Sequence, residues 1–139
     1  MKKTVEESVR EFHEKYGHLI SDSPTTGIPD NVKLLRRKLI EEEYFELLGA
    51  LLSDDATEIA DGIGDLVYVL VGTAISYGIP FDRIFSEIHN SNMTKTSVRA
   101  INGNKYGSEN PKGPGFISPQ IALILSEPDS LTELELRDN

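Results

Sequence analysis

Two groups of acidic side chains stand inside a stretch, residues 39–68, that otherwise has the apolar periodicity of helices packed in a core. The first group consists of Glu41, Glu42, Glu43 and Glu46, and the second consists of Glu58, Asp61 and Asp65. Residues three, four or seven positions apart share one face of an α-helix, so each group forms an acidic edge. Because carboxylates on facing edges repel each other, this stretch requires something cationic between them if the edges meet.

The segment between the two groups predicts that the edges do meet. Ser53, Asp54 and Asp55 are residues that end one helix and cap the next, which gives a tight helical hairpin. Hard divalent cations with oxygen ligands relieve the repulsion, and Mg²⁺ in particular combines carboxylates with substrate phosphates; Mn²⁺ is a substitute. The sequence therefore predicts a Mg²⁺ site and a phosphate-bearing substrate. The alternative is that both edges are solvated outer faces of ordinary acidic helices.

Four short motifs occur in one order along about residues 9–121. They are Glu42-Glu43-Tyr44-Phe45-Glu46, then Glu58-Ile59-Ala60-Asp61 with Gly64-Asp65-Leu66, then His89 to Lys95, then Lys112 to Phe116. In these motifs the chain resembles the all-α nucleoside triphosphate pyrophosphohydrolases, a group that includes MazG and phosphoribosyl-ATP pyrophosphohydrolase. The resemblance implies Mg²⁺-dependent cleavage of a nucleoside triphosphate between the α and β phosphates, which gives a monophosphate and pyrophosphate. Phosphoribosyl-ATP is a further candidate substrate on the same grounds.

The resemblance also implies roles for the acids. The expected metal ligands are Glu43, Glu46, Glu58, Asp61 and Asp65, and Glu42 or Glu43 is expected to orient the attacking water. The second ligand pair has two alternative registers. A literal E-x-x-D matches Glu58 and Asp61, whereas many members place the aspartate in a Gly-Asp-Leu step, here Asp65, with glutamate where this chain has Gly62.

Basic and amide side chains are candidates for contact with the substrate. In the resembling families the Asn and Lys after the fourth helix contact the nucleotide, which points to Asn92 and Lys95. Lys112 stands in a Gly-rich stretch that we interpret as a lid over phosphates, the alternative being a surface crossover. The basic residues of the second helix either pair with the acids one turn or so later, or Arg36 or Arg37 reaches a substrate phosphate.

The remaining patterns predict an all-α, antiparallel four-helix bundle-like fold of MazG type. The expected helices cover residues 4–16, 31–52, 56–77 and 83–93. Thr4 and Glu7 have the spacing of a capping box at the start of the first helix, Gly17 ends it, and an apolar stripe runs along it at Val5, Val9 and Phe12. Residues 100–119 are expected to be loop with a hairpin at Asn102-Gly103, 120–126 a short helix or strand, and 127–139 a peripheral tail. We expect a single domain, with a core at 4–95 and a loop-rich lid and tail at 96–139.

Composition limits the partners. The 139 residues carry a formal charge of −9, which disfavours nucleic acid and anionic membranes as partners. The absence of Cys excludes disulfides and thiolate zinc sites. With no signal-peptide pattern, a cytoplasmic protein is expected. The third helix carries more apolar surface than one neighbour covers, which predicts a homodimer or a dimer of dimers.

A second class of function stays open on the same residues. A non-catalytic helical protein that binds a cation, a nucleotide or a basic partner would use the same acidic face. Release of pyrophosphate from a panel of nucleotides, with and without Mg²⁺, separates the two readings.

Overall fold

The computed structural model describes residues 1–95, 112 and 114–127, and these residues contain helices and no strands. The helices are α1 (Val5–Tyr16), α2 (Asp30–Ser53), α3 (Ala56–Ser76), α4 (Phe81–Asn92) and α5 (Ile121–Ser126). The chain divides into an N-terminal unit, Met1–Phe81, and a C-terminal unit, Asp82–Asn139. The all-α prediction is therefore confirmed for the described residues, whereas the predicted Asn102-Gly103 hairpin and most of the lid lie outside them.

The ends of α1 follow from its capping residues. Thr4 Oγ1 accepts a hydrogen bond from Glu7 N (3.1 Å), and Thr4 N donates to Glu7 Oε2 (2.8 Å), which is the predicted capping box. Gly17 ends the helix in the left-handed region at φ 72°, and its N–H donates to His13 O. The predicted helix is thus confirmed, with Thr4 as its cap.

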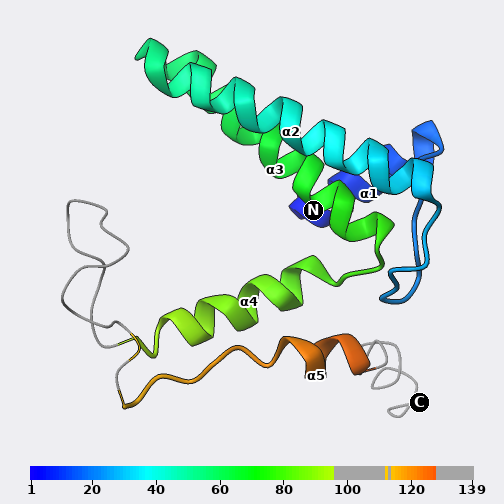
Figure 1. Ribbon diagram of the computed structural model, residues 1–139, viewed down its shortest axis with the longest axis vertical. Coiled ribbons are helices and arrows are strands. Elements are labelled where there is room, and N and C mark those ends of the chain that lie inside the picture. Colours follow the sequence, from blue (N-terminus) through cyan, green and yellow to red (C-terminus); the bar gives the residue numbers. More distant parts are fainter. Residues whose placement is uncertain (96–111, 113, 128–139) are drawn as a thin grey trace. The chain divides into compact units, whose positions relative to one another are not determined.

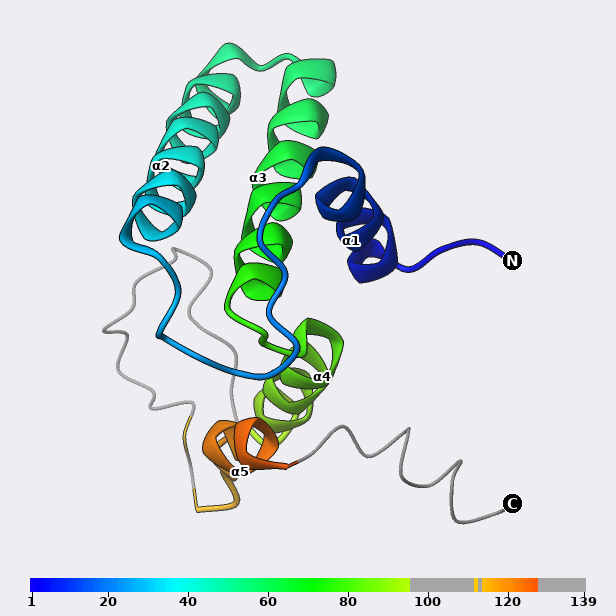
Figure 2. The same ribbon diagram turned by 90° about the vertical axis from the view of Figure 1, so that its right-hand side faces the viewer.

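The predicted turn between α2 and α3 is also present. Asp54 follows α2 in the left-handed conformation at φ 55°, and Asp55 Oδ1 accepts from Thr57 N (2.9 Å) and Glu58 N (3.4 Å) at the start of α3. Because only these two residues join the helices, α2 and α3 run antiparallel and side by side (Figures 1 and 2). Helix α2 extends one residue beyond each predicted end.

The core of the N-terminal unit lies between α1 and α3. Val9, Val71 and Ile75 are each at most 1% exposed, and Ile20 and Phe81 pack against them. Val71 and Ile75 are four residues apart, so one face of the second half of α3 receives α1. Figure 2 shows α1 beside α3. The apolar stripe that the sequence predicts on the first helix supplies Val9 to this core.

The loop after α1 is held against the end of α3 by hydrogen bonds. Ser76 Oγ donates to Leu19 O (2.9 Å), and Thr25 N donates to Tyr77 O (3.0 Å). Gly78 follows at φ 66°, and a Cβ there would lie 2.1 Å from the carbonyl oxygen of Ser23. The backbone of this loop therefore occupies the space that any side chain at position 78 would need.

Helix α3 leaves an apolar stripe uncovered within its unit. Ile63, Val67 and Leu70, spaced at i, i+4 and i+7, are 38–49% exposed. By length and composition α3 is also apolar enough to cross a bilayer, with a mean hydropathy of 1.5 over its most apolar window, a third of which is buried. Core helices of soluble proteins have the same features, so they alone do not indicate a membrane span.

The C-terminal unit is built on one face of α4. Ser91 Oγ donates to Ile117 O (2.7 Å), and Ile117 N donates to Thr94 Oγ1 (2.9 Å). Further along, Glu87 Oε1 accepts from Gln120 N (2.8 Å). Arg83 donates to Glu127 Oε2 (2.8 Å) one turn earlier on α4. Residues 117–127 therefore run back along α4 and are attached at successive turns, with α5 as the predicted short helix.

Candidate functional site

Three carboxylates from the two acidic edges meet between α2 and α3. Glu43, Glu46 and Asp65 each offer an oxygen, and these oxygens all lie within 4.8 Å of one another. Glu43 and Glu46 are three residues apart on α2, so they reach the same side of the helix, and the tight turn brings Asp65 of α3 opposite them. The structure thus brings together one member of the second acidic group with two of the first.

The environment of Glu43 tests whether this cluster suits a metal. Its Oε2 is buried and has no hydrogen-bond partner among the described residues. Burial raises the pKa of Glu43, and the nearby charges of Glu46, Asp65 and Glu42 raise it further. A buried carboxylate oxygen without a hydrogen-bond partner, beside two exposed carboxylates, is a donor set that suits Mg²⁺ or Mn²⁺. The residues therefore fit a divalent cation.

The other predicted acids lie outside this cluster. Glu42 is exposed and is the neighbour of Glu43 in sequence, and Glu58 and Asp61 are exposed on α3. Gly62 is buried, and a Cβ there would lie 3.2 Å from Leu47 Cα, so α2 and α3 approach each other closely at this level. Position 62, where many family members carry the glutamate, is here a site of helix packing.

The two registers of the second ligand pair can be separated by comparing Glu58→Gln with Asp61→Asn. We expect Asp61→Asn to weaken Mg²⁺ binding more, because Asp61 is one turn from Asp65 whereas Glu58 is two turns away. Isothermal titration with Mg²⁺ and no nucleotide measures this. A comparable loss in Glu58→Gln would instead support the register in which Glu58 and Asp61 form the pair.

Arg36 lies away from solvent, at 4% exposure. Its Nε donates to Thr73 Oγ1 (3.1 Å) and its Nη2 to Val69 O (2.9 Å). The structure therefore places Arg36 between α2 and α3, with two of its nitrogens bonded to α3. The sequence gives one signal for this burial: Gly72, above which the guanidinium and the His13 ring lie. Helical periodicity alone does not reveal that Arg36 is buried while Arg37 is exposed.

The remaining candidates belong to the C-terminal unit. Asn92 is exposed at the last position of α4, and Lys95 is exposed just after it. Lys112 is exposed, and its ammonium lies 5.3 Å from the centre of the Phe116 ring. Both hydrogen bonds of Ile117 go to Ser91 and Thr94, so the chain after Lys112 is attached near the end of α4 that carries Asn92 and Lys95.

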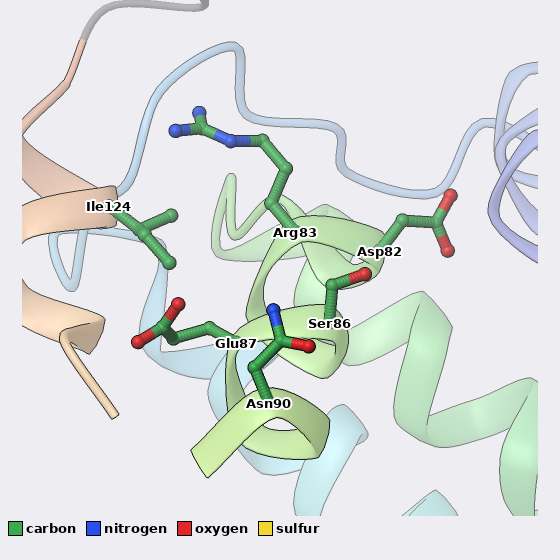
Figure 3. A pocket seen from close by; sticks show the side chains of 6 residues that line it. All are labelled: Asp82, Arg83, Ser86, Glu87, Asn90 and Ile124. Atoms are coloured by element: carbon green, nitrogen blue, oxygen red, sulfur yellow. The ribbon is translucent and has the colours of Figure 1, made fainter. Parts of the chain in front are cut away.

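An open hollow of about 330 Å³ lies elsewhere in this unit, between α4 and α5 (Figure 3). Five residues of α4 line it together with Ile124 of α5: Asp82, Arg83, Ser86, Glu87 and Asn90. Arg83 pairs with Glu127 and Glu87 accepts from Gln120 N, so these two side chains attach α5. None of the residues predicted to act on substrate lines this hollow.

Comparison with known proteins identifies the family of the chain. The family model described as phosphoribosyl-ATP pyrophosphohydrolase matches residues 9–92, which include all three clustered carboxylates. The chain is also 36% identical over 85 residues to an uncharacterized protein of Acanthamoeba polyphaga mimivirus. That match covers 58% of this chain and 34% of the viral protein, so it spans about a third of the relative. By the extent of the family match, the chain belongs to the phosphoribosyl-ATP pyrophosphohydrolase family.

Proposed function

We propose that the protein is a Mg²⁺-dependent nucleoside triphosphate pyrophosphohydrolase that cleaves between the α and β phosphates and releases a nucleoside monophosphate and pyrophosphate. The observation that carries this proposal is the group of Glu43, Glu46 and Asp65, with oxygens within 4.8 Å of one another and one buried oxygen without a partner. Family membership supports the reaction class, because the family consists of pyrophosphohydrolases.

The clustered carboxylates hold the metal in this proposal. A divalent cation held by Glu43, Glu46 and Asp65 would supply positive charge to stabilise the phosphate oxygens of the substrate. Glu43 and Glu46 approach from α2 and Asp65 from α3, so both helices must be in place for the site to exist. Glu42, which is exposed and next to Glu43 in sequence, or Glu43 itself is our candidate to orient the attacking water and accept its proton.

A nucleotide panel tests the proposal directly. The purified protein is incubated with the common ribo- and deoxyribonucleoside triphosphates and with phosphoribosyl-ATP, with Mg²⁺, with Mn²⁺ and with chelator. We expect pyrophosphate and the monophosphate, identified by mass, only with metal present. Release of inorganic phosphate instead of pyrophosphate would show that a different bond is cleaved. No product from any nucleotide of the panel would favour the non-catalytic binding function.

We propose that Lys95 contacts the phosphates of the substrate, as a mobile positive charge at the end of α4. We expect Lys95→Ala to raise KM about tenfold or more and to leave Mg²⁺ affinity without nucleotide unchanged, because one charge-assisted hydrogen bond of about 1.5–3 kcal/mol is lost. Lys112→Ala should have a smaller effect of the same kind. Nucleotide titration at saturating Mg²⁺ measures it, and an unchanged nucleotide affinity in Lys95→Ala removes Lys95 from the site.

We further propose that two copies of the chain associate through the exposed stripe of Ile63, Val67 and Leu70 on α3. The stripe repeats at i, i+4 and i+7, which is the pattern of a helix packed against another helix. We expect a dimer or a dimer of dimers by light scattering at micromolar concentration, and Val67→Glu should dissociate it. A monomer with full activity at those concentrations contradicts this proposal.

A further inference from the structure

Arg36 is a buried cation without a carboxylate partner. It is 4% exposed, and among the described residues no carboxylate lies within ion-pair distance of it. Its hydrogen bonds go instead to α3, to Val69 O and Thr73 Oγ1, and Thr73 Oγ1 itself donates to the same Val69 carbonyl (2.8 Å). Burying a guanidinium costs free energy of desolvation. The hydrogen bonds that offset part of this cost connect α2 to α3.

The space for this side chain exists because α3 has no side chain at position 72. A Cβ at Gly72 would lie 2.7 Å from Arg36 Nη2 and 2.8 Å from His13 Nε2. His13 Nδ1 in turn lies 3.1 Å from Leu19 O. The guanidinium is thus enclosed by α3 on one side and by the His13 ring of α1 on another, and it has little freedom to move. Because the Arg36 side chain is confined, its hydrogen bonds have a fixed direction, unlike those of a flexible charged side chain on the surface.

The Arg36 contact and the acidic cluster lie on the same facing sides of α2 and α3. Seven residues, or about two turns, separate Arg36 from Glu43 on α2 and Gly72 from Asp65 on α3, so each pair shares a helix face. The positions that approach each other are Arg36 with Gly72, Glu43 with Asp65, and Leu47 with Gly62. Along these three pairs the residue numbers increase on α2 and decrease on α3, as expected for antiparallel helices in one register.

We propose that Arg36 is a positioning residue for the carboxylate cluster: by bonding to Val69 and Thr73 it sets the register in which Glu43 and Glu46 of α2 stand opposite Asp65 of α3. A shift of one residue along a helix rotates its side chains by about 100°. Without the anchor, even part of such a rotation of α2 would move Glu43 and Glu46 away from Asp65. The inference rests on the proposed function only for the identity of the bound metal.

The first test measures metal binding without nucleotide or turnover. Titration calorimetry with Mg²⁺, well below each melting temperature, compares the wild type with Arg36→Met and Arg36→Lys and with the exposed neighbour variant Arg37→Met. We expect at least about tenfold weaker Mg²⁺ binding in Arg36→Met, an intermediate loss in Arg36→Lys because an ammonium lacks the planar fork, and no change in Arg37→Met. A lower melting temperature with wild-type Mg²⁺ affinity would make Arg36 merely structural and overturn the inference.

Thr73→Val keeps the test decisive if Arg36→Met does not fold. It removes the acceptor of the Arg36 Nε bond with nearly the same shape, so Mg²⁺ binding should weaken several-fold while the fold persists. Wild-type Mg²⁺ affinity in a folded Thr73→Val protein would equally count against the anchor.

The second test needs no metal and separates this inference from the proposed function. The chain has no Cys, so spin labels can be attached at Lys38→Cys on α2 and Gly64→Cys on α3, both exposed positions outside the apolar stripe of α3, with labelled chains diluted into unlabelled protein so that only distances within one copy are read. We expect the label distance distribution to shift or broaden in Arg36→Met. If the wild type binds no Mg²⁺, the proposed function fails, and an unchanged label distance between wild type and Arg36→Met overturns the positioning role by itself.

Discussion

Replacing Asp65 with asparagine should lower pyrophosphate release at least about 100-fold, because loss of a group that only supports metal ligands already costs 10–100-fold. Asp65 is the one contribution of α3 to the cluster. Glu46→Gln should have a comparable effect. The fold should persist and melt at the same or a higher temperature without metal, because one source of the repulsion that raises the pKa of Glu43 is removed. Initial rates with saturating Mg²⁺ and thermal melts in chelator give the two readouts.

Asp22→Asn is the matched control, since it makes the same chemical change in an exposed loop. Its rate should equal that of the wild type. Mg²⁺ should raise the melting temperature of the wild type and of this control through binding to the folded state, and should do so much less for Asp65→Asn. Wild-type turnover in Asp65→Asn would contradict the assignment of Asp65 as a metal ligand.

The substitution Gly78→Ala should destabilise the N-terminal unit by roughly 3 kcal/mol or more. A left-handed φ of 66° costs a residue with a Cβ about 1–2 kcal/mol, and that Cβ would lie 2.1 Å from the backbone oxygen of Ser23. The atom that the new Cβ would meet belongs to the backbone of Ser23 and not to the end of a flexible side chain, so the loop must move. In a unit of this size about 1 kcal/mol corresponds to roughly 4–8 °C, so a drop of more than about 10 °C is expected in a thermal melt.

Gly49→Ala supplies the comparison for this effect. Gly49 is an exposed position within α2 with nothing within 4 Å of a built Cβ. Alanine there should stabilise the helix by about 0.5–1 kcal/mol. Equal melting temperatures for the two alanine variants would show that the loop is not held against Gly78 as the structure has it.

Local chemistry made much of the N-terminal unit predictable. The Thr4 capping box, the Gly17 stop and the Asp54-Asp55 turn each depend on a few adjacent residues, and each is observed where it was expected. The acidic edges follow from helical spacing in the same way. Their meeting between α2 and α3 follows from the shortness of the turn, which leaves the helices no other arrangement than antiparallel neighbours.

The parts that were not predictable depend on three-dimensional neighbours. Arg36 and Arg37 are adjacent and chemically identical, yet only Arg36 faces Gly72 and becomes buried. Which of Glu58, Asp61 and Asp65 faces Glu43 depends on the rotation of α3, and that rotation is set in part by the close approach of Gly62 to Leu47. The attachment of Ile117 to Ser91 and Thr94 joins residues far apart in sequence, which no local pattern reports.

The carboxylate cluster draws its members from a single uninterrupted hairpin, which has a consequence for how the protein folds. Contacts between residues close in sequence form quickly, because little chain entropy is lost in closing the loop between them. The region from Glu43 to Asp65 contains only the last turns of α2, the Asp54-Asp55 turn and the first half of α3. We therefore expect the three acids to come together early in folding, before α1 docks, and a divalent cation bound at that stage would favour the correct pairing of the two helices.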